Sequence, residues 1–195
     1  MSSRCTTLVR GARLRAFTLV ELMIVVAIVG VLAALAVYGV RKYVLNAKTA
    51  EARNALGQMA KDAITGYTRE RINPALLPLG GTTGVVNVLC ESATAVPLAV
   101  GLIKGQKYQS NPNDWAGTGW NCLRFSMQDP QYYQYNYVAT GSRTNAGDGF
   151  TAVAVGNLDG DSATGRFELR GELKADPQDL VIILAPNILE FNPDE

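Results

Sequence analysis

The feature that most constrains this chain is an unbroken apolar block near its N-terminus. Residues 22–40 carry no charge and are almost entirely aliphatic. At about 1.5 Å per residue, a helix of this length spans roughly 28 Å, which matches the hydrocarbon core of a bilayer. The block is too long and too evenly apolar for the core helix of a globular domain, so it predicts a membrane-spanning helix.

Charge is distributed unevenly around this block. Residues 1–16 contain four arginines and no acid, although the whole chain of 195 residues has a net charge of only +1. After Lys174 there are five acids and no base. A basic head, an apolar block and a mildly acidic body are typical of a membrane-directed chain, and no specific nucleic-acid partner is expected.

The composition also excludes several classes of enzyme. The chain has no histidine, so Ser-His-Asp catalysis, Cys-His catalysis and His-ligated zinc are all excluded. The sequence contains neither a phosphate-binding loop nor a dinucleotide fingerprint. Carboxylates remain available, but no pair of them stands out. We therefore expect that the protein is not an enzyme.

The apolar block allows three interpretations. It can be a simple membrane anchor, or a cleaved secretory signal whose small-x-small site at residues 34–36 releases a soluble binding domain. The third interpretation depends on Glu21, which lies inside the apolar stretch. An ionised carboxylate within a membrane helix costs about 2.5–3.5 kcal/mol on insertion scales, so Glu21 needs a partner or a purpose.

Residues 15–21, Arg-Ala-Phe-Thr-Leu-Val-Glu, and the apolar run behind them resemble the N-terminus of type IV prepilins and pseudopilins. In that family a peptidase cuts before the apolar segment, the new N-terminal residue is methylated, and a Glu stands fifth. The resemblance places the cut between Ala16 and Phe17, the methyl group on Phe17, and the family glutamate at Glu21. Ala16 replaces the usual Gly, and Tyr38-Gly39 stands where many members have a Pro.

The resemblance implies a structural filament subunit, and more specifically a major pilin. Its precursor would lie in the bacterial inner membrane, where the prepilin peptidase would remove the basic leader, residues 1–16, and the methyltransferase would methylate Phe17. Pilus assembly machinery would then polymerise the subunit into a homo-oligomeric extracellular filament for surface motility, adhesion or DNA uptake. The alternatives are a type II secretion pseudopilin and, from another class, the secreted soluble binding domain.

Glu21 has two candidate partners. The resemblance implies that in the filament its buried carboxylate pairs with the Phe17 amine of a neighbouring subunit, which would set the axial register. The alternative is that Glu21 pairs within its own helix. A second and looser resemblance, over residues 107–133, is to pilins of predatory and gliding delta-type bacteria, and it favours a pilin over a pseudopilin.

The expected fold class is α+β, with the pilin arrangement. Apolar residues at spacings of three and four continue from Val40 to Tyr67 and predict one helix from Phe17 to about Arg69, ended by Asn73-Pro74. The alternative is two helices broken at Gly39. The first part of the helix, residues 17–40, would span the membrane or form the filament core, and the amphipathic part, residues 41–71, would pack on a sheet.

Residues 72–120 are rich in turn-forming residues and predict a variable connecting region with little regular structure. Alternating or β-branched patterns then predict an antiparallel sheet within residues 121–195. Its expected strands are 122–127, 132–139, 150–155, 166–173 and 180–184. Tyr133, Tyr135 and Tyr137 share one strand face, and we expect this face to pack in the core.

The mature chain would keep two cysteines, Cys90 and Cys122, because Cys5 leaves with the leader. An even pair in an exported protein predicts a disulfide, with two reduced, buried thiols as the alternative.

One pattern suggests a metal site. Asn157, Asp159, Asp161 and Glu168 stand at the first, third, fifth and twelfth places of a calcium-loop pattern. Ser162 stands where that pattern wants Gly, so the alternative is an Asp-Gly turn between two strands. Some pseudopilins bind calcium near their C-terminal end, and calcium is the one cofactor that the sequence leaves open.

Overall fold

The computed structural model describes residues 17–69, 71–72, 79–81, 85–177 and 179–193. The expected leader with Ala16, and the expected helix stop at Asn73-Pro74, lie outside the described residues. The chain divides into two compact units, residues 1–42 and residues 43–195, which are described separately below.

The N-terminal unit contains the start of helix α1, which spans Leu19–Thr68. The helix continues through Gly39, so the alternative of two helices broken there is wrong. Every described side chain from Phe17 to Lys42 is exposed. Helix α1 is long and apolar enough to cross a membrane by length and composition, as the apolar block predicts.

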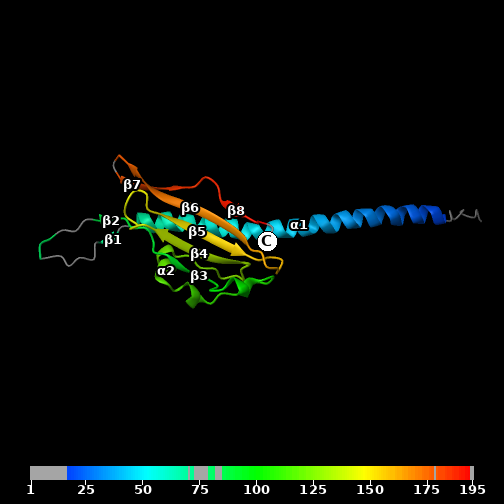
Figure 1. Ribbon diagram of the computed structural model, residues 1–195, viewed down its shortest axis with the longest axis horizontal. Coiled ribbons are helices and arrows are strands. Elements are labelled where there is room, and N and C mark those ends of the chain that lie inside the picture. The colour runs from blue at the N-terminus through cyan, green and yellow to red at the C-terminus, as the bar shows by residue number, and fades with distance from the viewer. Residues whose placement is uncertain (1–16, 70, 73–78, 82–84, 178, 194–195) are drawn as a thin grey trace, which may run out of the picture. The chain divides into compact units, whose positions relative to one another are not determined.

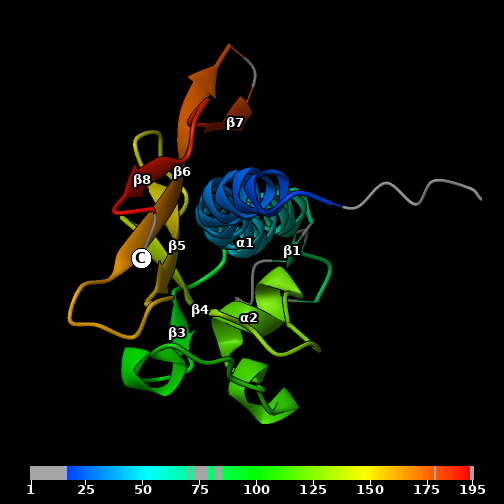
Figure 2. The same ribbon diagram turned by 90° about the vertical axis from the view of Figure 1, so that its right-hand side faces the viewer.

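The second unit is built on an antiparallel sheet. Its strands are β3 (Ala93–Val96), β4 (Tyr133–Thr140), β5 (Gly149–Gly156), β6 (Gly165–Asp176), β7 (Asp179–Leu184) and β8 (Leu189–Phe191). The strand order is β3-β4-β5-β6-β7, and β8 pairs with β6. The part of α1 in this unit lies along one face of the sheet (Figures 1 and 2). The expected α+β class is confirmed.

Shorter elements lie between α1 and β4. They are the two-stranded ladder of β1 (Arg71–Ile72) and β2 (Val85–Val86), the 3-10 helices η1 (Val100–Ile103) and η2 (Pro112–Trp115), and helix α2 (Thr118–Leu123). The expected strand 122–127 is wrong, because Cys122 and Leu123 belong to α2. Arg124 then ends the helix in the left-handed conformation, with φ of 62°.

The core forms between α1 and the sheet. The buried face of α1 repeats at the spacing of helical turns and includes Ala52, Leu56, Met59, Ala63 and Tyr67. Tyr133, Tyr135 and Tyr137 of β4 are 0% exposed and belong to the same hydrophobic cluster. The expectation that these three tyrosines form a packing face is therefore confirmed.

Two aromatic rings on this face fold over glycines of the neighbouring strand. Tyr133 is paired with Gly156, and Phe150 with Gly171. A Cβ on Gly156 would lie 2.4 Å from Cε1 of Tyr133, and a Cβ on Gly171 would lie 2.4 Å from Cε1 of Phe150. The rings therefore occupy the space that a side chain would need, and glycine is required at both positions.

Substitution of Gly156 by alanine should destabilise the protein, because the added methyl group overlaps the buried Tyr133 ring. We expect a loss of about 1–3 kcal/mol in the free energy of unfolding, typical of overpacking. Gly57→Ala is the matched control, since Gly57 lies in α1 and a Cβ added there would have nothing within 4 Å. There alanine should raise stability by up to about 1 kcal/mol. Urea unfolding of the detergent-solubilised chain would measure both changes in the free energy of unfolding. Changes of the same sign would contradict the close packing of Tyr133 on Gly156.

Helix α2 covers the β3 edge of the sheet. The indole Nε1 of Trp120 donates to the carbonyl oxygen of Thr94 at 2.8 Å. A Cβ on Gly119 would lie 2.7 Å from the carbonyl oxygens of both Glu91 and Ser92. The helix thus lies directly against this edge. It occupies the place where a further strand could otherwise pair with β3.

The opposite edge is interrupted. Strand β7 pairs with residues 171–176 of β6, and β8 pairs with residues 166–168. Residues 185–188 separate the two strands, and they include Pro186, which has no backbone N–H to donate. The edge beyond β6 is therefore two short segments rather than one long strand.

Candidate functional site

The N-terminus of α1 is closed by a capping box formed by Thr18 and Glu21. The backbone N–H of Glu21 donates to Oγ1 of Thr18 at 3.2 Å. In return, the backbone N–H of Thr18 donates to Oε2 of Glu21 at 2.9 Å. The Thr18 hydroxyl also donates to Oε2, at 2.9 Å. This reciprocal pair satisfies N–H groups that have no partner within the helix.

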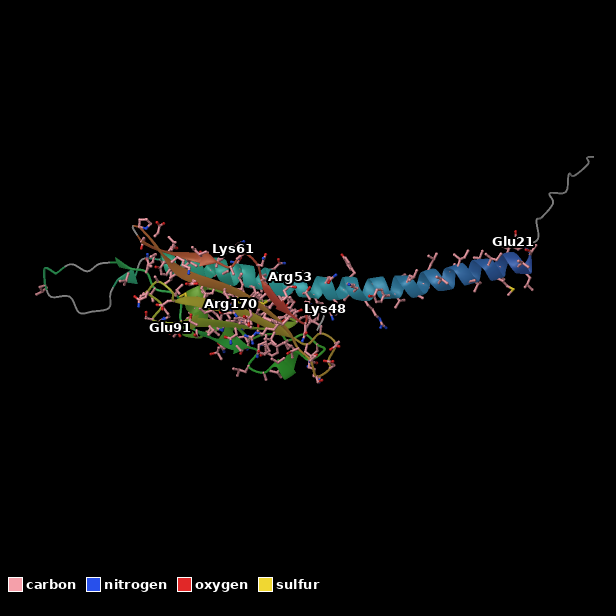
Figure 3. All side chains as sticks on the ribbon, turned by 45° about the horizontal axis from the view of Figure 1, so that its top comes forward. Glu21, Lys48, Arg53, Lys61, Glu91 and Arg170 are labelled. Atoms are coloured by element: carbon pink, nitrogen blue, oxygen red, sulfur yellow. A yellow bond between two sulfur atoms is a disulfide. The ribbon has the colours of Figure 1, made fainter. Side chains whose placement is uncertain are left out.

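The carboxylate of Glu21 therefore has a local role in the single chain. It is bonded within its own helix, which is the alternative that the sequence left open. Both bonds use Oε2, and pairing with the Phe17 amine of another subunit stays a prediction. Glu21 marks the end of the helix in Figure 3. Thr18 was not among the expected site residues, although the Thr-x-x-Glu spacing is a known signal for a helix start.

The apolar side chains behind the capping box are uncovered. Phe17 is 77% exposed, and Leu19, Leu35 and Val40 are each more than 60% exposed. None of the residues in the most apolar stretch of α1 is buried. So extensive an apolar surface is rare on a soluble monomer and indicates that lipid or another protein covers it.

The predicted disulfide is confirmed. Cys90 and Cys122 form a bond with a Cα–Cα distance of 5.6 Å. The bridge lies against α1, because a Cβ on Gly66 would be 2.7 Å from Sγ of Cys90. Arg69 donates to the carbonyl oxygen of Cys122 at 2.9 Å. The bridge joins the connecting region to α2, whereas the expected strand 122–127 would have placed Cys122 in the sheet. It holds both segments at the end of α1.

The expected calcium ligands are engaged with the protein. Nδ2 of Asn157 donates to the carbonyl oxygens of Asp161 and Ala163, at 3.1 and 2.8 Å. The carboxylates of Asp159 and Asp161 accept backbone N–H groups of their own loop. These bonds are typical of an Asx-stabilised turn. Within the described residues, no group of three or more acidic, cysteine or histidine side chains is arranged to hold a metal ion.

Glu168, the twelfth residue of that pattern, lies between two arginines of β6. Its carboxylate is 2.6 Å from Arg166 and 2.8 Å from Arg170. Burial raises the pKa of Glu168, but the hydrogen bonds from the two guanidinium groups outweigh burial and hold the pKa below its usual value. The calcium site stays a prediction, in competition with these arginine contacts.

A second polar cluster lies at the start of the α1 segment in this unit. Oε1 of Glu51 accepts the backbone N–H of Tyr132 at 2.9 Å and the hydroxyl of Tyr135 at 3.0 Å. Burial raises the pKa of the Glu51 carboxyl above its usual value, although these bonds and Lys107 act against the shift. Lys48 and Lys107 both approach the ring of Tyr132, with Nζ-to-centroid distances of 4.9 and 4.6 Å.

Comparison with known proteins gives the same N-terminal segment and two relatives. Residues 12–37 match the family described as the prokaryotic N-terminal methylation motif. The chain is 28% identical to the fimbrial protein EcpC of Eikenella corrodens, over 60% of this chain and 86% of the relative. It is 34% identical to the type IV major pilin protein PilE1 of Neisseria gonorrhoeae, over 51% of this chain and 46% of the relative.

No solved structure matches this chain. The chain thus spans most of the first relative but less than half the length of the second. The likeness of residues 107–133 to delta-type pilins stays a prediction, because these relatives do not bear on it.

Proposed function

We propose that this chain belongs to the type IV pilin family and is the main structural subunit of a type IV pilus. The precursor is anchored in the bacterial inner membrane by α1, cut between Ala16 and Phe17, and methylated on the Phe17 amine. The pilus assembly machinery then polymerises it into a filament on the cell surface. Surface motility, adhesion and DNA uptake are the activities that such a filament would serve.

One observation carries the proposal. The segment that matches the methylation motif, residues 12–37, includes the capping box and the start of the uncovered apolar helix. In the precursor, lipid would cover these side chains, and in the filament, helices of neighbouring copies would replace the lipid. The two coverings are similarly apolar, so helix packing and polar pairing at Glu21 would favour the filament.

The capping box also bears on how Glu21 enters the filament. Thr18 uses Oε2 of Glu21, so Oε1 remains the oxygen through which a neighbouring Phe17 amine would bind. Cleavage creates that amine directly before the capping box. A secondary amine keeps its positive charge after methylation, so the modified terminus would still pair with the carboxylate.

The secreted domain and the pseudopilin, the two alternatives, differ in whether the mature chain keeps the N-terminal segment. A cut after Ala36 would release a soluble domain and remove Thr18 and Glu21 together with most of the matched motif. A pseudopilin would keep the segment and assemble in a secretion system. The pilin is favoured because both relatives named above are described as pilus or fimbrial proteins.

Mass spectrometry of the N-terminal peptide, taken from the native host, tests the processing step. We expect a peptide that begins at Phe17 and carries one additional methyl group. A peptide that begins at Val37 would overturn the filament proposal in favour of a secreted domain. An uncut chain from Met1 would show that Ala16 prevents cleavage and that the protein stays a membrane anchor.

A further inference from the structure

A groove with excess positive charge lies beside Tyr132. It has a volume of about 260 Å³ and is lined by Tyr43, Val44, Ala47, Lys48, Glu51 and Tyr132. We call it the Tyr132 groove. Lys107 adds a second ammonium group to that of Lys48 at the same aromatic ring. Two cations at one ring benefit from its negative face, but they repel each other.

The groove neutralises these two lysines only in part. Neither Lys48 nor Lys107 forms an ion pair with a carboxylate in the described part of the chain. Glu51 lines the groove and interacts electrostatically with Lys107, but its single negative charge faces two ammonium groups, and its Oε1 also accepts the Tyr132 N–H and the Tyr135 hydroxyl. An anionic group from outside the chain would therefore be attracted to this place.

Elsewhere the same chain carries two neighbouring carboxylates with excess negative charge. Asp176 ends β6 and Asp179 begins β7, and the two residues are directly opposite each other in the ladder. We call this pair the acidic tip. Both residues are exposed, and neither forms an ion pair with a described cation. Like charges directly opposite on neighbouring strands are destabilising, so an external cation would relieve the repulsion.

The two surfaces belong to different ends of the α1 segment in this unit. Lys48 and Tyr132 lie near its start. The acidic tip adjoins its end, because the hydroxyl of Tyr67 donates to the carbonyl oxygen of Leu180 at 3.4 Å. Lys48 and Tyr67 are about 28 Å apart along the helix axis, given the rise per residue. Figure 3 labels Lys48 and Lys61 along this segment, with Lys61 nearer the end that holds β7.

We infer that the acidic tip of one copy docks on the Tyr132 groove of another, pairing Asp176 and Asp179 with Lys48 and Lys107. The inference rests on the proposed function, because it needs copies of the chain to polymerise. The two surfaces differ and lie at different ends, so the contact is head-to-tail, and such contacts extend into an open polymer. Its charges would steer subunits into one register rather than supply most of the binding energy.

Charge reversal in the full-length chain, expressed in its native host, tests this contact. One variant combines Lys48→Glu with Lys107→Glu, and a second combines Asp176→Lys with Asp179→Lys. Each places like charges together, and we expect each to reduce sheared surface filaments about tenfold or more. The variant with all four substitutions restores opposite charges and should return filaments to within about threefold of the unmodified chain.

Two exposed positions outside both surfaces serve as matched controls. Lys61→Glu reverses a lysine of the same helix, and Asp129→Lys reverses an exposed aspartate. Neither should reduce filaments more than about twofold, because isolated surface charges contribute little. Immunoblots of the membrane fraction, with and without reductant, would verify subunit amount and the disulfide in every variant. If a reversed pair does not accumulate, Lys48→Gln with Lys107→Gln replaces it, with a several-fold loss expected.

Several results would overturn the contact. Filaments at the unmodified level in either reversed pair, or in the neutral lysine pair, would show that these charges are not used. A loss in both reversed pairs that the fourfold variant does not restore would also overturn it. In that case, preferential retention of phosphatidylglycerol over phosphatidylcholine by the detergent-solubilised chain, lost when both lysines are replaced by glutamine, would assign the groove to anionic lipid headgroups. An absence of filaments from the unmodified chain would instead contradict the proposed function.

Discussion

The Glu21→Ala variant should insert into the membrane but form no filaments. Insertion should become easier, because a carboxylate inside a membrane helix costs about 2.5–3.5 kcal/mol. In the filament, loss of Glu21 would leave the Phe17 amine buried without its partner, at a cost of about 3–5 kcal/mol in each subunit. Electron microscopy of sheared surface material and immunoblots of the membrane fraction would measure the two effects.

Two further variants separate the capping role of Glu21 from its charge. Glu21→Gln keeps an oxygen that can accept the Thr18 N–H, because capping boxes use Glu or Gln, but it removes the negative charge. Thr18→Ala removes the hydroxyl from the box and keeps the charge. We expect Glu21→Gln to lose filaments and Thr18→Ala to retain them. The reverse pattern would show that Glu21 acts through its own helix, as it does in the single chain.

Removal of the Cys90–Cys122 bridge should have the largest effect on the stability of the second unit. The two cysteines are separated by 32 positions, and the chain-entropy relation gives a loss of about 3.5–4 kcal/mol in the free energy of unfolding. A variant with both cysteines replaced by alanine would be compared with the unmodified chain in urea, in detergent. Fluorescence of Trp115 and Trp120, which are both buried in the second unit, reports the transition.

Reduction of the unmodified chain provides the control for this comparison. Its unfolding midpoint should fall to that of the double variant, because both lose the same cross-link. A midpoint that stays at the oxidised value after removal of both cysteines would contradict the stabilising role. It would mean that the contacts of α1 with the sheet alone hold the end of the helix.

Much of the fold follows from patterns that are local in the sequence. Both boundaries of the expected helix lie within two residues of those of α1 (Leu19–Thr68). The agreement is close because the apolar spacing persists over many turns. The strands expected at 132–139 and 150–155 match β4 and β5 to within one residue at each end. Period-two alternation is strong where one face of a strand is buried.

The elements that the sequence did not predict depend on distant partners. Strand β3 is short and lies in a turn-rich region, and its position is set by pairing with β4. Strand β8 is shorter still and is held by β6 and by an ion pair between Glu190 and Arg53 of α1, at 2.8 Å. Helix α2 is short and has no side-chain N-cap, so the local pattern around Cys122 resembled a strand.

At the candidate site, the sequence predicted which residues matter but not which hydrogen bonds they form. Glu21 was identified by its charge within an apolar stretch, and the disulfide by the cysteine count. The hydrogen bonds of Glu21 with Thr18 required the backbone of the first helical turn. The two arginines on Glu168 required the side-chain alternation of β6 in three dimensions, since only the strand places residues 166, 168 and 170 on one face.

Neither edge of the sheet is open along its length, and this limits the kind of fibre that the chain can form. One edge is covered by α2 through Trp120 and Gly119, and the other is broken at Pro186 between β7 and β8. A long, flat, open edge would invite strands of crowded neighbours to add, and amyloid would compete with ordered assembly. With both edges blunted, strand addition is disfavoured even among crowded copies, which would leave helix packing as the route by which the proposed filament grows.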